Sequence, residues 1–211
     1  MPKITKITVQ VKQPSRMNIF VDDKFFTGLD QLYCIQYGLR MGQEVSAQFC
    51  EKILKIDQAE TVYKKALKLL AIRPQSTFEI RQKLRQREFA ANHIEQTVSR
   101  LEKNNLLNDD EFAISWIKHR LENRLRSTQH LISELRQKGI AKLTIQSAIE
   151  QTNMADQELL IATKLLQAKL RQTKLPINKV KVRGYLSRRG FSYGTILAAE
   201  KILASNAEDA A

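Results

Sequence analysis

Acidic side chains that could bind a metal ion or transfer a proton are concentrated at one place in the sequence. Asp109, Asp110 and Glu111 are consecutive, and clustered carboxylates can act as metal ligands or as general acids and bases. They directly precede an apolar run that begins at Phe112, and acidic residues stabilise the positive N-terminus of a helix. We therefore interpret the cluster as the start of a helix and not as a catalytic or metal site.

The other candidate groups show no pattern that is typical of an enzyme. The sequence contains neither a GxxxxGK[ST] phosphate loop nor a GxGxxG motif. His93, His119 and His130 lie among polar or basic residues, without cysteines or paired carboxylates at ligand spacing, so we interpret them as exposed helix residues. Cys34 and Cys50 alone cannot form a disulfide framework. We predict no catalytic site, no cofactor and no bound metal.

A large excess of positive charge is the strongest chemical signal. The chain has 35 Lys and Arg against 22 Asp and Glu, a formal charge of +13. This excess predicts an anionic partner, which could be nucleic acid, a membrane surface or an acidic protein groove. A solvated surface that maintains solubility is the alternative. The excess lies mainly in residues 59–109, with +4, and residues 161–211, with +7.

Bases recur at related positions of three short segments, and these residues are the candidates for binding. A base in the last turn of a helix offsets the helix dipole, which explains Arg87, Lys138 and Arg189. The dipole does not explain bases near helix starts, such as Lys181 and Arg183. We therefore expect a binding role for the set as a whole. The candidates are Arg81, Lys83, Arg85, Arg87, Lys118, Arg120, Arg124, Arg126, Arg136, Lys138, Lys179, Lys181, Arg183, Arg188 and Arg189.

An internal repeat positions these bases. The segment "STFEIRQKLRQREF" at 76–89 returns 51 residues later as "STQHLISELRQKGI" at 127–140, and again as "NKVKVRGYLSRRGF" at 178–191. Apolar residues keep this register in all three copies, which predicts the same buried face three times. The matching residues are Ile80, Leu131 and Val182; Leu84, Leu135 and Leu186; Phe89, Ile140 and Phe191; and Ile94, Ile145 and Ile196.

Capping residues mark the ends of the short helix in each copy. Ser76, Ser127 and Asn178 share one position and are all good N-caps, and Glu79 completes a capping box with Ser76. Gly139 and Gly190 stand where a helix ends in a left-handed residue, a pattern that Glu88 breaks in the first copy.

Each copy is predicted to contain three helices. We expect them near 59–72, 77–88 and 91–103, near 110–125, 128–138 and 142–152, and near 156–173, 178–189 and 193–204. Three tandem copies bury their faces against one another, so the fold class is mainly α: an elongated, curved solenoid of three-helix repeats. We place these repeats at residues 59–108, 109–155 and 156–211.

The N-terminal part of the chain has a different pattern. Ile7, Val9 and Val11 alternate with polar residues, and "MNIFVDDKFFTG" predicts two strands around a turn at Asp22-Asp23. We expect a β-hairpin or three-stranded sheet over 1–28 and a helical connector over 29–58, interrupted at Gly38 and Gly42. The start of the chain has no apolar signal region, and no segment approaches the ~20 apolar residues of a membrane span, so we expect a cytoplasmic protein.

The repeat motifs resemble the family of RecX regulatory proteins. The resemblance rests on "IRPQSTFEIRQKLRQREF", "VSRLEKNNLLNDDEFA" and "ISELRQKGI", which follow in the family's order and cover roughly residues 59–155. The N-terminal hairpin and "QYGLRMGQEV" are similar to the longer, Gram-positive-type members. Asn108 departs from the pattern, where an Asp is common, and so does Glu88, where a Gly often stands.

The resemblance implies a recombination regulator without a catalytic site. Members of the family bind the RecA recombinase, alone or as its filament on single-stranded DNA. They are thought to lie in the groove of the filament and to inhibit its ATPase, strand exchange and growth, which implies roles in DNA repair, DNA recombination and the SOS response. For this chain we expect a monomer that binds RecA and its nucleoprotein filament.

Two other functions remain open on the sequence. One is a helical-repeat protein that binds nucleic acid without a recombinase target, since the short helix and the next one could imitate a helix-turn-helix motif. Against it, no short helix gathers Asn, Gln and Arg on one outward face suited to base edges. The other is a protein-interaction solenoid with solvated charges. Direct contact with single- or double-stranded DNA is likewise left open.

Overall fold

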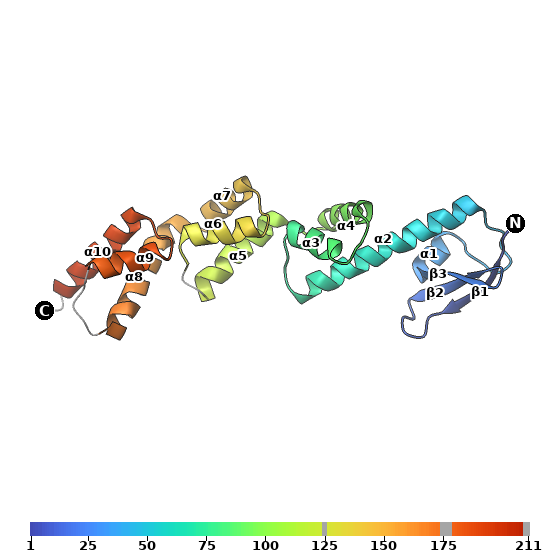
Figure 1. Cartoon of the computed structure of the whole chain (residues 1–211), viewed down its shortest axis with the longest axis horizontal. Coiled ribbons are helices and arrows are strands. Elements are labelled where there is room, and N and C mark those ends of the chain that lie inside the picture. Colours follow the sequence, from blue (N-terminus) through green and yellow to red (C-terminus); the bar gives the residue numbers. More distant parts are fainter. Residues whose placement is uncertain (124–125, 174–178, 209–211) are drawn as a thin grey trace. The chain divides into compact units, whose positions relative to one another are not determined.

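The alternating N-terminal residues form a three-stranded antiparallel sheet (Figure 1). The computed structural model describes residues 1–123, 126–173 and 179–208. The strands are β1 (Ile4–Val9), β2 (Arg16–Val21) and β3 (Lys24–Asp30), in the order β1-β2-β3. Asp22 and Asp23 connect β2 to β3 with φ of 48° and 65°, the left-handed pair that a tight hairpin turn needs. The predicted strands and turn are confirmed, except that β1 ends at Val9, so Val11 lies beyond the strand and is exposed.

A short helix and a long helix follow the sheet. Helix α1 (Gln31–Gln36) ends before Gly38, and α2 (Ala47–Ile72) begins after Gly42; both glycines have positive φ, as the predicted interruptions require. The expected helix start near residue 59 is wrong. Ser46 caps α2 by accepting the backbone N–H of Phe49 at 3.2 Å, so one helix runs from the end part of the expected connector into the first repeat without a break at residue 59.

The sheet packs against these two helices around one apolar core. Ile4, Ile19 and Leu29 from the strands are buried together with Cys34 of α1 and Ile53 of α2. The sheet, α1 and α2 belong to a compact unit of residues Met1–Arg73 and Lys83–Leu101, which we call unit 1. The rest of the chain, Pro74–Gln82 and Glu102–Ala211, forms unit 2.

The predicted three-helix repeats are present. The first comprises the end of α2, α3 (Thr77–Arg85) and α4 (Ala91–Lys103). The second comprises α5 (Asp109–Asn123), α6 (Thr128–Gln137) and α7 (Lys142–Gln151), and the third α8 (Met154–Thr173), α9 (Lys179–Ser187) and α10 (Tyr193–Glu208). Among the described residues, no helix is long and apolar enough to cross a bilayer.

The repeated apolar positions are the core of these helices. Leu84, Leu135 and Leu186 are fully buried, and the residues matched with them in the repeat register are buried as well, with the exception of Phe89. The predicted caps also form. Ser76 Oγ accepts the N–H of Glu79 at 3.1 Å, while a carboxylate oxygen of Glu79 accepts the N–H of Ser76 at 3.2 Å. Asn178, the third predicted cap, lies outside the described residues.

Within unit 2, the capping serines also connect successive repeats. Ser76 Oγ donates to the backbone carbonyl of Lys138 at 2.6 Å, and Ser127 Oγ donates to that of Arg189 at 2.7 Å. Each hydroxyl therefore caps the start of one short helix and satisfies a carbonyl that follows the short helix of the next repeat. We call these two contacts the serine joints.

A residue two or three positions after the end of each short helix is left-handed in all three repeats. Gly139 and Gly190 have φ of 76° and 77°, and Glu88 at the same register position has φ of 60°. A side chain at Gly139 would place its Cβ 2.3 Å from the Cβ of Phe78. The backbone pattern is therefore regular even where the sequence departs from glycine.

Candidate functional site

The acid cluster has the structural role that the sequence predicts. Asp109, Asp110 and Glu111 form the first turn of α5, and Asn108 caps that helix by accepting the N–H groups of Asp110 and Glu111. Asp109 also accepts the N–H of Thr77 at 2.8 Å, at the start of α3. Among the described residues, no three His, Cys, Asp or Glu side chains are placed to hold a metal ion.

The histidines depart in part from the expected exposure. His119 is exposed, whereas His93 is half-buried and lies 3.3 Å from the side-chain oxygen of Gln58. His130 is also half-buried, with Nδ1 3.1 Å from the carbonyl oxygen of Arg189 at the second serine joint. Packing between elements explains the difference, because both rings contact residues far away in the chain.

One candidate base, Arg120, belongs to a partly buried cluster around Glu134. Arg120 Nε and Trp116 Nε1 each donate to the same carboxylate oxygen at 2.8 Å, and Arg126 lies 3.9 Å from the other oxygen. Burial raises the pKa of Glu134, but the hydrogen bonds from Arg120 and Trp116 and the two positive charges outweigh it and lower that pKa below 4.5. Arg120 therefore contributes to the packing of α5 against α6.

Lys138 is likewise engaged inside unit 2. Its Nζ lies 2.9 Å from a carboxylate oxygen of Glu79 and 4.2 Å from the centre of the Trp116 ring, and its side chain is only 16% exposed. Because Glu79 also completes the capping box at Ser76, the ion pair strengthens the first serine joint. This contact accounts for Lys138 independently of any partner.

Arg183 has an intramolecular partner that the sequence did not indicate. Its guanidinium donates to both carboxylate oxygens of Glu200 in α10, with bonds of 3.0 to 3.1 Å. This bidentate hydrogen bond raises the pKa of Arg183. Arg183 lies at the middle of α9 (Lys179–Ser187) and not near a helix start as the sequence predicted, and the pair with Glu200 explains this cation.

The remaining candidates differ in exposure. Arg81, Lys83 and Arg126 are half-buried, and Arg189 is exposed with its guanidinium 4.6 Å from the centre of the Tyr185 ring. Arg124 and the side chain of Lys179 lie outside the described residues. The other exposed candidates are Arg85, Arg87, Lys118, Arg136, Lys181 and Arg188. A binding role for these residues stays a prediction.

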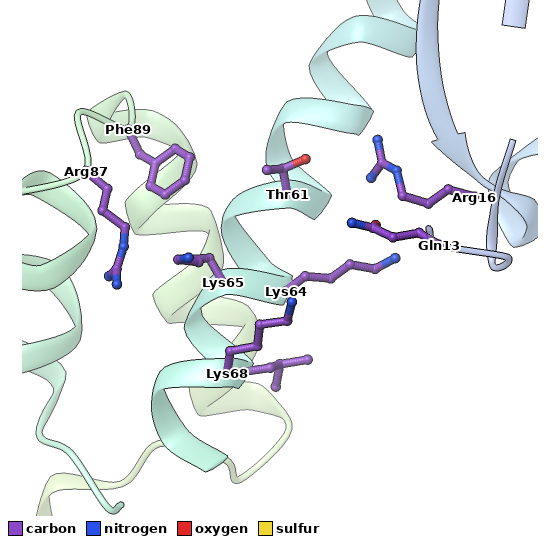
Figure 2. Close-up of a pocket in the computed structure, with 9 residues that line it drawn as sticks. Gln13, Arg16, Thr61, Lys64, Lys65, Lys68, Arg87 and Phe89 are labelled. Carbon is purple, nitrogen blue, oxygen red and sulfur yellow. The ribbon is translucent and has the colours of Figure 1, made fainter. Parts of the chain in front are cut away.

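The structure adds a basic cavity in unit 1 that the sequence reasoning did not identify. Its volume is about 550 Å³, and its lining contains five bases and no acidic residue. Figure 2 shows three lysines of α2 between Gln13 and Arg16 on one side and Arg87 and Phe89 on the other. The full lining is Gln13, Arg16, Thr61, Lys64, Lys65, Leu67, Lys68, Arg87 and Phe89.

Two of the five bases are fixed by carboxylates outside the lining. Arg16 donates to Asp57 at 2.6 Å, and Lys64 donates to Asp30 at 2.6 Å. Burial raises the pKa of Asp30, yet the hydrogen bonds from Lys64 and from the N–H of Leu32 outweigh it and lower that pKa. The carboxylates therefore compensate the charges of Arg16 and Lys64 and hold these two side chains in place at the cavity.

The other three bases are not paired in this way. Lys65, Lys68 and Arg87 have no carboxylate partner within the described residues, and Arg87 donates only to the carbonyl of Lys83, at 3.4 Å. A sequence signal for this site exists, since residues 64, 65 and 68 lie on one side of a helix. Only the fold shows that the N-terminal sheet and the loop after α3 complete it.

The chain is similar to known proteins over most of its length. Family models for the "Regulatory protein RecX N-terminal domain", "RecX, first three-helix domain" and "RecX, second three-helix domain" match residues 2–46, 63–101 and 108–149. The "Regulatory protein RecX" of Bacillus subtilis (strain 168) is 32% identical over 99% of this chain and 80% of its own length. The protein of the same name from Bacillus licheniformis is 29% identical over 94% of this chain and 76% of its own.

Solved structures give the same answer at the level of the fold. A crystal structure of regulatory protein RecX superposes with a TM-score of 0.80 and 25% identity, covering 95% of this chain and all of that one. A RecX structure from Lactobacillus salivarius has a TM-score of 0.66 and 20% identity, covering 71% of this chain and 98% of that one, and supports the fold alone. The three-helix units, the N-terminal sheet and the matched sequences agree: the chain belongs to the RecX family of regulatory proteins.

Proposed function

We propose that this protein binds the RecA recombinase, alone or as its filament on single-stranded DNA, and inhibits ATP hydrolysis, strand exchange and filament growth. The observation that carries the proposal is the similarity to proteins named Regulatory protein RecX across nearly the whole chain. A regulator of this kind takes part in DNA repair and recombination and in the SOS response, and we expect it to have no catalytic activity of its own.

The distribution of exposed bases supports an anionic partner. Arg85, Arg136 and Arg188 are exposed, and each lies on or just after the short helix of a different repeat. Structural ion pairs account for Arg120, Lys138 and Arg183, so these three residues are not needed to explain binding. Exposed cations on or beside the short helix of every repeat suit a partner that is itself built from repeated units.

A RecA ATPase assay on single-stranded DNA tests the proposal. We expect the protein to lower ATP hydrolysis by RecA and to hydrolyse no ATP by itself. The variant Arg85→Glu/Arg136→Glu/Arg188→Glu should inhibit less and bind the filament more weakly. The control variant Lys24→Glu/Arg40→Glu/Lys103→Glu changes the net charge equally at other exposed positions and should inhibit like the parent.

The possible results separate the candidate functions. No effect of the parent protein on ATP hydrolysis, filament binding or strand exchange would contradict the proposal. A protein that binds DNA but leaves RecA unaffected would be a nucleic-acid-binding protein without a recombinase target. Equal loss in both triple variants would show that net charge matters and that the positions of these three arginines do not.

A further inference from the structure

We propose that the basic cavity of unit 1 binds a single-stranded nucleic acid. The phosphates of that strand would contact Lys65, Lys68 and Arg87, and one of its bases would stack against Phe89. The inference goes beyond the proposed function, because it assigns to named residues of unit 1 a nucleic-acid site that acts without any recombinase.

The charges of the cavity provide the first argument. The two bases that have carboxylate partners, Arg16 and Lys64, form its wall, whereas Lys65, Lys68 and Arg87 have none among the described residues. Three cations of like charge around one concave space repel one another. An anion with several charges relieves this repulsion, and a phosphate backbone also releases its own counterions on binding.

The placement of Phe89 provides the second argument. The repeat aligns Phe89 with Ile140 and Phe191, which are buried to 4% and 5% exposure, whereas Phe89 is only half-buried and lines the cavity. The first repeat therefore leaves accessible an apolar side chain that the other two bury. An aromatic ring beside a basic groove is the usual platform on which single-stranded bases stack, because every base has an apolar face.

The lining also decides between possible anions. Sites for free nucleotides use backbone N–H groups of glycine-rich loops or helix N-termini, whereas this cavity is lined by side chains and includes no glycine. In a duplex the faces of the bases are covered by stacking, so Phe89 can contact only an unstacked base. The acidic side chains of a peptide would pair with the cations but would not stack on the aromatic ring. A single strand uses the cations and the ring together.

Fluorescence anisotropy of a labelled oligothymidylate with the full chain and no recombinase tests the site. We expect Lys65→Gln/Lys68→Gln/Arg87→Gln to weaken binding roughly tenfold or more at low salt, since three phosphate contacts are lost. The slope of log affinity against log salt should fall by about 2, because each single-strand contact contributes roughly 0.7. The control Lys24→Gln/Arg40→Gln/Lys103→Gln removes two lysines and one arginine at exposed positions elsewhere and should stay within about threefold of the parent.

Phe89 requires its own pair of variants. Phe89→Leu keeps an apolar side chain but removes the ring, and should weaken binding roughly fivefold or more, given about 1–3 kcal/mol per stacked base. Phe89→Trp should bind as tightly as the parent. Melting curves show whether each variant is folded. If the triple variant unfolds, Lys68→Gln alone, at an exposed position, should still reduce the salt slope by about 0.7.

Several results would overturn the inference. Parent-like binding by the triple variant, or an equal loss in its control, would remove the cavity from the interaction. If thymidine monophosphate, duplex DNA or polyglutamate competed as effectively as the unlabelled oligothymidylate, the cavity would be a site for a different ligand. The RecA ATPase assay is read separately, so failure of this inference and failure of the proposed function are distinguishable.

Discussion

At the scale of single residues, Glu88 has a backbone conformation that its side chain disfavours. Its φ of 60° is left-handed, and the residues at the same position in the later repeats are Gly139 and Gly190. For residues other than glycine the left-handed region costs roughly 1–2 kcal/mol. The regular geometry of the repeat imposes this conformation, so the glutamate at position 88 lowers the stability of the first repeat.

Replacement of Glu88 by glycine should therefore stabilise the protein. We expect Glu88→Gly to raise the free energy of unfolding by about 1 kcal/mol in a urea titration. The exposed helical residue Gln82 supplies the control, since Gln82→Gly should lower stability by roughly 0.5–1 kcal/mol. A Glu88→Gly protein that is no more stable than the parent would show that the glutamate is not strained.

At the scale of elements, the same leucine anchors the short helix of every repeat. Leu84, Leu135 and Leu186 are 0% exposed, whereas Leu143 of α7 is 79% exposed. We expect each of the substitutions Leu84→Ala, Leu135→Ala and Leu186→Ala to cost roughly 2–5 kcal/mol of unfolding free energy. Leu143→Ala, the same change on the surface, should cost less than about 0.5 kcal/mol. Chemical denaturation measures the unfolding free energy of all four variants. If the loss at one of the buried leucines were as small as at Leu143, that leucine would not belong to the core.

The contact between α5 and α6 should depend on pH through Glu134. Its pKa is lowered in the folded protein, because the stabilising hydrogen bonds and charges outweigh burial, so its contribution is fully present above the ordinary value of 4.5. That contribution is lost as the pH falls through the lower folded-state pKa. The stability difference between the parent and Glu134→Gln should therefore be largest near neutral pH and shrink below about pH 4.5. Denaturant titrations across this pH range measure the difference, and Glu111→Gln, at an exposed position, is the control. A stability difference that does not change with pH would contradict the prediction.

The elements also show which parts of the structure the sequence can reveal. Helices, caps and core leucines follow from local periodicity, and the 51-residue register fixes each of them three times. The start of α2 was missed because the apolar residues of its N-terminal turns, such as Phe49 and Ile53, pack in the core of the sheet and lie outside the repeat register, so they were assigned to a separate connector. The ion pairs of Lys138 and Arg183 could not be predicted, since Glu79 and Glu200 come from other helices. The basic cavity likewise combines a sheet, a helix and a loop.

At the scale of the whole molecule, the 51-residue repeat of the sequence predicts an elongated monomer. Repeats that contact only their sequence neighbours extend along one direction instead of closing into a sphere. Small-angle X-ray scattering should give a monomeric mass and a radius of gyration well above the ~17 Å of a globular chain of this length. A globular value, or the mass of a dimer, would contradict this prediction.

The serine joints have a consequence for synthesis on the ribosome. Each hydroxyl and its carbonyl acceptor are separated by 62 positions, so the first part of a joint is translated well before the second. At about 5–20 residues per second, Ser76 is made roughly 3–12 s before Lys138. During that interval the nascent first repeat lacks the Lys138 carbonyl and the Lys138 ammonium that Glu79 will pair with. The first joint therefore cannot form until the second repeat has been made, nor the second joint until the third repeat has been made, so each joint closes about one repeat behind translation.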